Sequence, residues 1–208
     1  ETIMLTQHAA KAGADAVLLI TPYYNKPTQE GLYQHYKAAA DAVDIPQILY
    51  NVPGRTGVNM LPETVARLSE IKNIVGIKEA TGSLQHVSDV IEKCREDFVI
   101  LSGDDFTTLP LLAIGGHGVI SVTANIAPND MSDMYDVFAV GDLEEARKLH
   151  YKLQPLHRAM FYETNPIPVK TALAMMGMIK EEFRLPLVKM GKCNREKLKG
   201  VLKDYGLI

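Results

Sequence analysis

Lys78 is the residue whose place in the sequence most clearly suggests covalent chemistry. It follows directly on the apolar run 74–77, which is typical of a buried strand. Apolar surroundings lower the pKa of a lysine, and the neutral amine can then attack a ketone to form a Schiff base. Alternatively, the Lys78 side chain extends into solvent or pairs with a neighbouring carboxylate such as Glu79.

Tyr50 and Arg55 lie at and after the end of the preceding strand-like run, 47–52. Neighbouring strands are ~4.8 Å apart, so a phenol at position 50 can relay protons to and from a Schiff-base intermediate. Arg55 lies in the loop Pro-Gly-Arg-Thr-Gly, where its planar guanidinium is suited to bind a substrate carboxylate. The alternatives are a core tyrosine with a satisfied hydroxyl and a surface arginine in a turn.

Other unusual residues follow the remaining strand-like runs. Tyr23 and Tyr24 form an aromatic pair before a turn, which suits either a subunit contact or simple packing. Gly54 and Gly103 would let the backbone approach a ligand closely. We therefore expect several loops to contribute to one site.

Several other polar residues near the strand ends are predicted to have structural roles only. Asp104 and Asp105 are expected to cap the helix that follows them, and His117 is expected in a tight turn at the opposite edge of the sheet. The other histidines, such as His8 and His35, fall on expected helices without the spacing of metal ligands, so no metal site is predicted.

Five short apolar runs, rich in β-branched residues, must position these side chains. They show little alternation, which is typical of a parallel sheet buried on both faces, and the segments between them have helical periodicity. Such βα repeats predict a doubly wound sheet or a (β/α)8 barrel, and in both the site lies at the carboxyl ends of the strands. The strands are expected at 16–21, 47–52, 73–79, 98–103 and 118–123, and the helices at 28–43, 62–70, 83–95 and 128–140.

From about residue 141 the strand-like runs cease and helical periods dominate, over 142–162, 166–179 and 194–205. We therefore predict two domains, a βα domain at 1–141 and a C-terminal helical domain at 142–208. A βα unit takes ~30 residues, so the first domain holds about five units, whereas a complete barrel has eight.

The composition excludes several classes of protein. The 22 Lys and Arg residues against 25 Asp and Glu residues give a formal net charge of −3, too balanced to indicate a nucleic-acid or membrane partner. Cys94 and Cys193 lie far apart without metal or redox spacing and are expected to be reduced thiols in a cytoplasmic protein. No apolar run approaches the ~20 residues of a membrane helix.

Taken together, the motifs resemble those of the 4-hydroxy-tetrahydrodipicolinate synthase (dihydrodipicolinate synthase) family, within the pyruvate-dependent class I aldolases. The resemblance runs through essentially all 208 residues. Its most specific mark is the arginine loop, because sialic acid lyases usually lack an arginine there. It rests on Tyr-Asn-Val-Pro-Gly-Arg-Thr-Gly at 50–57, Gly-Ile-Lys-Glu-Ala-Thr-Gly at 76–82, Thr-Pro-Tyr-Tyr-Asn at 21–25, Leu-Ser-Gly-Asp-Asp at 101–105, Gly-Gly-His-Gly-Val-Ile-Ser-Val at 115–122 and Asn-Pro-Ile-Pro-Val-Lys at 165–170.

The resemblance implies a TIM barrel and a lyase of lysine and diaminopimelate biosynthesis that condenses pyruvate with L-aspartate 4-semialdehyde. It implies that Lys78 forms the Schiff base with pyruvate, without a cofactor, and that Tyr50 relays protons. Arg55 would bind the carboxylate of the semialdehyde, and the backbones of Gly103 and Ile120 would line the pocket. The family also implies a homo-oligomer, a dimer or a dimer of dimers.

Three further residues have roles at a subunit interface in this family. By resemblance, Tyr24 would reach across the interface into the neighbouring site. Tyr23 and Glu1 match positions that contact lysine in feedback-inhibited members.

The sequence departs from the family at its beginning. The family has three further βα units there, including a Thr-Thr-Gly-Glu loop that holds the pyruvate carboxylate. We therefore expect an incomplete barrel of about five units, either a fragment or a truncated relative. Two other functions stay open: another pyruvate aldolase, of the keto-sugar-acid or sialic acid lyase type, and an inactive oligomerisation module.

Overall fold

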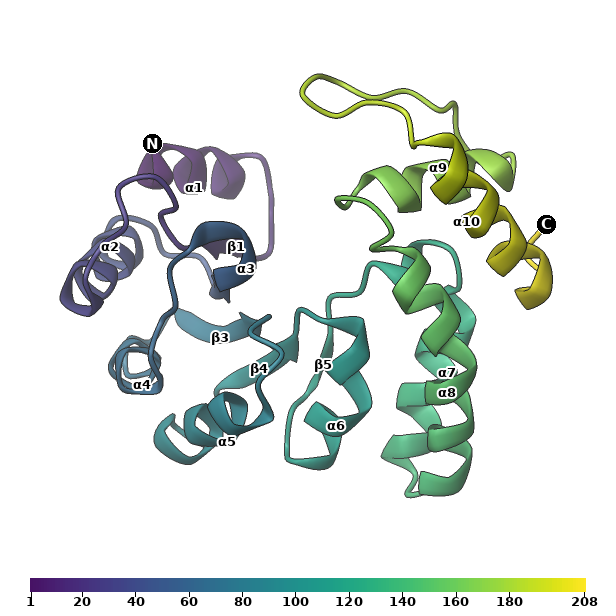
Figure 1. Ribbon diagram of the computed structural model, residues 1–208. Coiled ribbons are helices and arrows are strands. Elements are labelled where there is room, and N and C mark those ends of the chain that lie inside the picture. The colour runs from purple at the N-terminus through teal and green to yellow at the C-terminus, as the bar shows by residue number, and fades with distance from the viewer. The chain divides into compact units, whose positions relative to one another are not determined.

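Five strands form one parallel sheet, in the order β1-β2-β3-β4-β5, in the computed structural model, which describes residues 1–208 (Figure 1). This confirms the predicted parallel α/β sheet. The chain divides into two compact units, Glu1–Ile120 and Ser121–Ile208, and the sheet belongs to the first. The strands are β1 (Val17–Ile20), β2 (Gln47–Asn51), β3 (Ile74–Glu79), β4 (Val99–Ser102) and β5 (Gly118–Val119).

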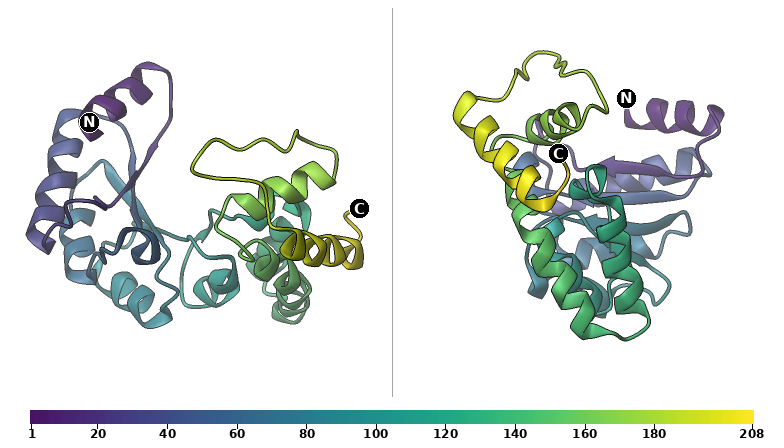
Figure 2. Two further views of the ribbon diagram at one scale, coloured as in Figure 1. Left: turned by 45° about the horizontal axis from the view of Figure 1, so that its top comes forward. Right: turned by 90° about the vertical axis from the view of Figure 1, so that its right-hand side faces the viewer.

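Helices alternate with these strands and pack side by side in chain order along one face of the sheet (Figure 2). Two of the predicted helix starts carry side-chain caps. The hydroxyl of Thr28 accepts a hydrogen bond from the N–H of Gly31, and the hydroxyl of Ser83 accepts one from the N–H of His86, both at 3.2 Å. The helices of this unit are α1 (Thr2–Lys11), α2 (Gln29–Ala42), α3 (Pro53–Thr56), α4 (Pro62–Ser69), α5 (Leu84–Lys93) and α6 (Thr108–Ala113), with a 3-10 turn at Asp105–Thr107.

One face of the sheet is buried more deeply than the other in this unit. Leu49 and Ile77, on the face that the helices cover, are 0% exposed. On the opposite face, Leu18 and Ile20 of β1 remain 43% and 41% exposed. The prediction of strands buried on both faces is therefore wrong for β1, because α1, α2, α4 and α5 all cover the same side.

The last strand is shorter than predicted. Pairing with β4 ends where the N–H of Ile120 donates to the carbonyl of Ser102 at 2.9 Å. The hydroxyl of Ser121 then accepts a hydrogen bond from the N–H of Ala124 at 2.8 Å, and the chain enters a 3-10 turn at Thr123–Asn125. A side-chain hydrogen bond to the backbone thus replaces the strand that the apolar pattern predicted over 118–123.

The second unit is helical, with α7 (Pro128–Ala139), α8 (Leu143–Ala159), α9 (Ile167–Met175) and α10 (Lys192–Tyr205). The helices α7 and α8 pack against each other on either side of Gly141, whose φ of +88° suits the turn. The expected domain boundary at 141/142 falls inside this pair, whereas the division by packing lies at Ile120/Ser121. None of the helices in the chain has the length and apolarity that crossing a membrane requires.

We expect Gly76→Ala to destabilise the first unit by about 1–3 kcal/mol, because its new Cβ meets atoms that cannot move aside. That Cβ would lie 2.5 Å from the carbonyl oxygen of Val99 and 2.9 Å from the Val99 Cβ. Urea unfolding measures the effect. The matched control is Gly200→Ala on α10, where nothing lies within 4 Å and the helix should gain roughly 0.5–1 kcal/mol. Equal stability of Gly76→Ala and the parent protein would contradict the close approach of β3 and β4.

Candidate active site

Lys78 and Tyr50 face each other across neighbouring strands. They are partners in the parallel register of β2 and β3, one residue before each strand ends. The Nζ of Lys78 lies 4.3 Å from the centroid of the Tyr50 ring. The structure thus brings together the two residues that the sequence singled out for a Schiff base and a proton relay.

Burial shifts the acidity of both groups in useful directions. The Lys78 pKa is lowered, chiefly because the half-buried ammonium loses solvation, while the charge of Asp105 acts in the opposite sense. The Tyr50 pKa is raised by burial, and the charge of Arg55 opposes that shift. Both shifts act towards a neutral amine beside a protonated phenol, which is the pairing that nucleophilic attack followed by proton transfer needs.

Gly103 makes room for the lysine. A Cβ at position 103 would lie 3.0 Å from the Cε of Lys78 and 2.7 Å from the Cβ of Ala80. The N–H of Gly103 donates to the carbonyl of Glu79 at 2.7 Å. The missing side chain therefore shapes the space that the Lys78 side chain occupies, in addition to any approach of a ligand.

Arg55 lies on the short helix α3 and is exposed to solvent, with its charge close enough to Tyr50 to act on the phenol. The helix ends at Gly57, whose φ is +64°. A Cβ there would lie 2.6 Å from the Nζ of Lys26, so a second cation stands beside this loop. Lys26 was not predicted from the sequence, because nothing in its local pattern indicates that it reaches residue 57.

The two aspartates after β4 have different roles. Asp104 caps the 3-10 turn as predicted, since its Oδ1 accepts a hydrogen bond from the N–H of Phe106 at 3.2 Å. Asp105 is not a cap. It begins the turn, is 2% exposed, and its charge acts on Lys78. The prediction of a capping role for Asp105 is wrong because the cap position falls one residue earlier.

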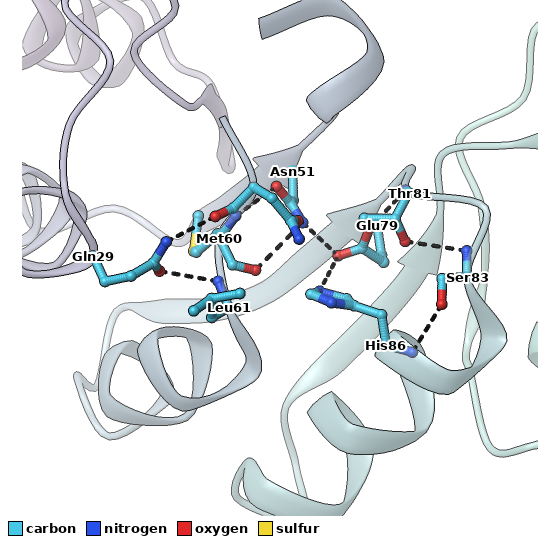
Figure 3. A network of polar contacts seen from close by, with 9 residues as sticks. Gln29, Asn51, Met60, Leu61, Glu79, Thr81, Ser83 and His86 are labelled. Atoms are coloured by element: carbon cyan, nitrogen blue, oxygen red, sulfur yellow. Dashed lines mark hydrogen bonds and ion pairs between the residues drawn. The ribbon is translucent and has the colours of Figure 1, made fainter. Parts of the chain in front are cut away.

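Glu79 does not pair with Lys78, which was one alternative from the sequence. Successive side chains of a strand point to opposite faces, so Glu79 lies on the helix-covered face and Lys78 on the other. Glu79 is 2% exposed, and its Oε2 accepts a hydrogen bond from the Nδ2 of Asn51 at 3.0 Å (Figure 3). Asn51 was not recognised from the sequence, although its position beside Tyr50 and one strand from Glu79 follows from the register.

The remaining candidate residues lie at the start of the chain, after β1 and after β5. Tyr24 is 89% exposed on the loop after β1. It lines a hollow of about 430 Å³ together with Tyr23 and Glu1, so the structure brings together the two residues that resemble lysine contacts. The N–H of Ile120 is already bonded to the carbonyl of Ser102, and its side chain is 38% exposed.

His117 has a structural role, as predicted from its place before β5. Its Nδ1 accepts a hydrogen bond from the N–H of Ile100 at 3.1 Å. In residues 1–208 no group of three or more His, Cys, Asp and Glu side chains is arranged to hold a metal ion.

The chain is similar to members of one family both in sequence and in structure. The sequence model of the "Dihydrodipicolinate synthetase family" matches residues 1–205. Among curated proteins, the chain is 66% identical over 208 residues to a 4-hydroxy-tetrahydrodipicolinate synthase of Thermodesulfovibrio yellowstonii, and it covers 72% of that protein.

Two solved structures are also closely similar. The chloride-inhibited dihydrodipicolinate synthase from Acinetobacter baumannii, complexed with pyruvate, matches with a TM-score of 0.96 and 53% identity over 99% of this chain and 71% of that one. The enzyme from Cyanidioschyzon merolae with lysine bound matches with a TM-score of 0.97 and 40% identity, over 100% of this chain and 72% of that one.

Proposed function

Because the chain belongs to the dihydrodipicolinate synthetase family, we propose that Lys78 forms a Schiff base with pyruvate in a 4-hydroxy-tetrahydrodipicolinate synthase. The observation that carries the assignment of Lys78 is its half-buried amine, 4.3 Å from the centroid of the Tyr50 ring at the carboxyl ends of two strands. The pyruvate in the similar Acinetobacter baumannii structure supports the choice of keto acid.

The proposed reaction begins and ends at the Lys78 amine. The neutral amine of Lys78 attacks the keto carbon of pyruvate, and the carbonyl oxygen leaves as water after protonation. The Schiff base loses a methyl proton to become an enamine, whose carbon attacks the aldehyde of L-aspartate 4-semialdehyde. The amine of that substrate then closes the ring on the Schiff-base carbon and releases Lys78. Tyr50 moves the protons of these steps.

Arg55 is proposed to bind the carboxylate of the semialdehyde. Its guanidinium is exposed on α3 at the mouth of the site, where a second substrate arrives after the pyruvate adduct has formed. Gly103 and Ile120 are proposed to line the pocket, Gly103 through the space it leaves beside Lys78.

We also propose that the sheet corresponds to about five units of a (β/α)8 barrel and that the chain works as a homo-oligomer, a dimer or a dimer of dimers. Tyr24 is then supplied to the site of a neighbouring copy, which its 89% exposure in a single chain supports. Lysine is proposed to bind in the hollow that Tyr23 and Glu1 line, as the lysine in the Cyanidioschyzon merolae structure suggests.

Replacing Arg55 by alanine separates this synthase from another pyruvate aldolase. We expect turnover of aspartate semialdehyde to fall about 10- to 100-fold, because a charged hydrogen bond to a carboxylate contributes roughly 1.5–3 kcal/mol. Formation of the pyruvate adduct should stay within about 3-fold of the parent rate, since Arg55 is proposed to contact only the second substrate.

Steady-state kinetics with aspartate semialdehyde, and borohydride trapping with pyruvate alone, measure the two effects. Arg147→Ala on α8, another exposed arginine, is the control. Full turnover by Arg55→Ala would favour an arginine-independent aldolase, and failure of the parent protein to trap pyruvate would favour an inactive module.

A further inference from the structure

On the helix-covered face of the sheet, a buried polar cluster joins the ends of β2 and β3 (Figure 3). Its centre is the Glu79 carboxylate, whose Oε2 accepts a hydrogen bond from the Asn51 Nδ2 at 3.0 Å and whose Oε1 accepts one from the N–H of Thr81 at 2.8 Å. The Nε2 of His86, on α5, lies 3.2 Å from the same Oε2. Glu79 therefore links two strands, the loop after β3 and a helix.

This cluster lies directly behind the proposed catalytic pair. Asn51 and Glu79 are register partners, one residue beyond the partners Tyr50 and Lys78. Because side chains alternate along a strand, the first pair faces the helices and the second pair faces the site. A one-residue slip between β2 and β3 would turn each side chain to the wrong face, so the Asn51–Glu79 bond opposes the slip that would separate Lys78 from Tyr50.

Asn51 extends the cluster to the segment that follows the arginine loop. Its Oδ1 accepts a hydrogen bond from the N–H of Met60 at 3.0 Å, and its Nδ2 donates to the Oδ1 of Asn59 at 2.9 Å. Gln29 of α2 completes the connection, since its Nε2 donates to the carbonyl of Asn59 and its Oε1 accepts from the N–H of Leu61. The same cluster thus joins the ends of the two strands that carry Lys78 and Tyr50 to the segment that follows Arg55.

We propose that Glu79 is a positioning residue for the reaction, holding the Lys78 amine over the Tyr50 ring through its bond to Asn51, and that His86 modulates this hold with pH. The inference rests on the proposed roles of Lys78 and Tyr50. Glu79 itself touches neither substrate nor the reacting atoms.

The pH dependence follows from the groups that face His86. Its pKa is raised, first by the Glu79 carboxylate, whose Oε2 lies 3.2 Å from the His86 Nε2, and then by the charges of Asp89 on α5 and Glu63 on α4, against the opposing effect of burial. Below that raised pKa the buried carboxylate has a cationic neighbour. As the pH rises through it, His86 becomes neutral and the interaction weakens, so positioning and local stability are greatest at lower pH and are lost on the alkaline side.

Glu79→Gln tests the positioning role, since it keeps the size of the side chain but removes the charge and leaves one acceptor oxygen for two donors, the Asn51 Nδ2 and the N–H of Thr81. We expect its rate of borohydride-trapped pyruvate adduct formation and its kcat to fall about 10-fold or more, because small misplacements of a nucleophile are costly, with KM for pyruvate within about 3-fold. Glu92→Gln, on the exposed side of α5, is the control and should match the parent protein. Trapping and turnover of Glu79→Gln at the parent rate would overturn the proposal.

His86→Gln tests the proposed effect of His86 protonation. This variant can contradict the proposal even if Glu79→Gln does not fold. The ratio of the parent trapping rate to the His86→Gln rate cancels the titration of Lys78 itself. We expect that ratio to exceed 1 near pH 6, at about 3-fold or more, and to approach 1 at alkaline pH. A ratio of the two trapping rates that does not change with pH would overturn the proposed role of His86. Should the parent protein trap pyruvate on no residue, or on a residue other than Lys78, the proposed function fails and not merely the positioning role.

Discussion

Replacing Lys78 by glutamine is expected to abolish the pyruvate adduct and to lower turnover by roughly 10⁴-fold or more, since loss of a covalent nucleophile removes the whole intermediate. Glutamine keeps most of the length of the side chain but has no basic amine. The half-buried position of Lys78 over the Tyr50 ring explains why another lysine cannot substitute, because covalent attack requires the amine at that place.

Reduction with borohydride in the presence of pyruvate measures this directly. The parent protein should gain the mass of one reduced adduct, located by peptide mapping on the peptide that contains Lys78, and Lys78→Gln should gain none. Lys72→Gln, an exposed lysine shortly before β3, is the matched control and should be labelled as the parent is. A label on Lys72, Lys26 or any other lysine would contradict the assignment.

The pH dependence of trapping has a definite sign. The amine is reactive when neutral, and burial lowers the Lys78 pKa from its ordinary value of 10.5. The rate of adduct formation at saturating pyruvate should therefore rise with pH and reach its half-maximum below pH 10.5. A midpoint at or above 10.5 would mean that the site does not favour the neutral amine.

The pairing of Lys78 with Tyr50 was predictable from the sequence for a simple reason. Parallel strands place their carboxyl ends at one edge of the sheet, so two residues that end consecutive apolar runs must lie about one strand spacing apart. The helix starts at Thr28 and Ser83 were predictable on similarly local grounds, since each cap is satisfied within three residues of the chain.

Features that depend on distant partners were not predictable in this way. The end of β5 is decided by the hydrogen bond of Ser121 to the backbone, which competes with an apolar pattern that favours a strand. The burial of Asp105 depends on how the turn after β4 packs. The partners of Glu79 come from β2 and α5, and a single sequence does not indicate that Asn51 and His86 meet it.

Tyr24 has no such partner on a neighbouring strand. It is 89% exposed in the single chain, and its role in a neighbouring site stays a prediction. Arg55 was predictable in part. Its loop motif placed it after β2, and the structure adds that its charge acts on Tyr50. The local pattern therefore predicted that Lys78 and Tyr50 lie together, whereas the contacts of Asn51 and Glu79 behind them required the fold.

Tyr50→Phe is expected to lower turnover by about 10²- to 10⁴-fold while leaving Lys78 able to form its adduct, more slowly. Phenylalanine keeps the aromatic ring beneath the Lys78 Nζ, so the contact at 4.3 Å and the surrounding packing persist. Only the hydroxyl is lost, and with it the group proposed to move protons. The variant therefore isolates proton transfer from the position of the lysine.

Single-turnover trapping and steady-state turnover, measured on the same preparation, separate these two steps. Tyr33→Phe is the matched control, because the Tyr33 ring also lies under a cation, with the Arg67 guanidinium carbon 3.9 Å from its centroid, but on α2 and α4, away from the Lys78 pair. It should retain parent turnover. If Tyr50→Phe lost adduct formation and turnover to the same extent, the phenol would be acting before or during Schiff-base formation alone. Full turnover would remove Tyr50 from the chemistry, and the ring contact with Lys78 would then serve only to hold the amine in place.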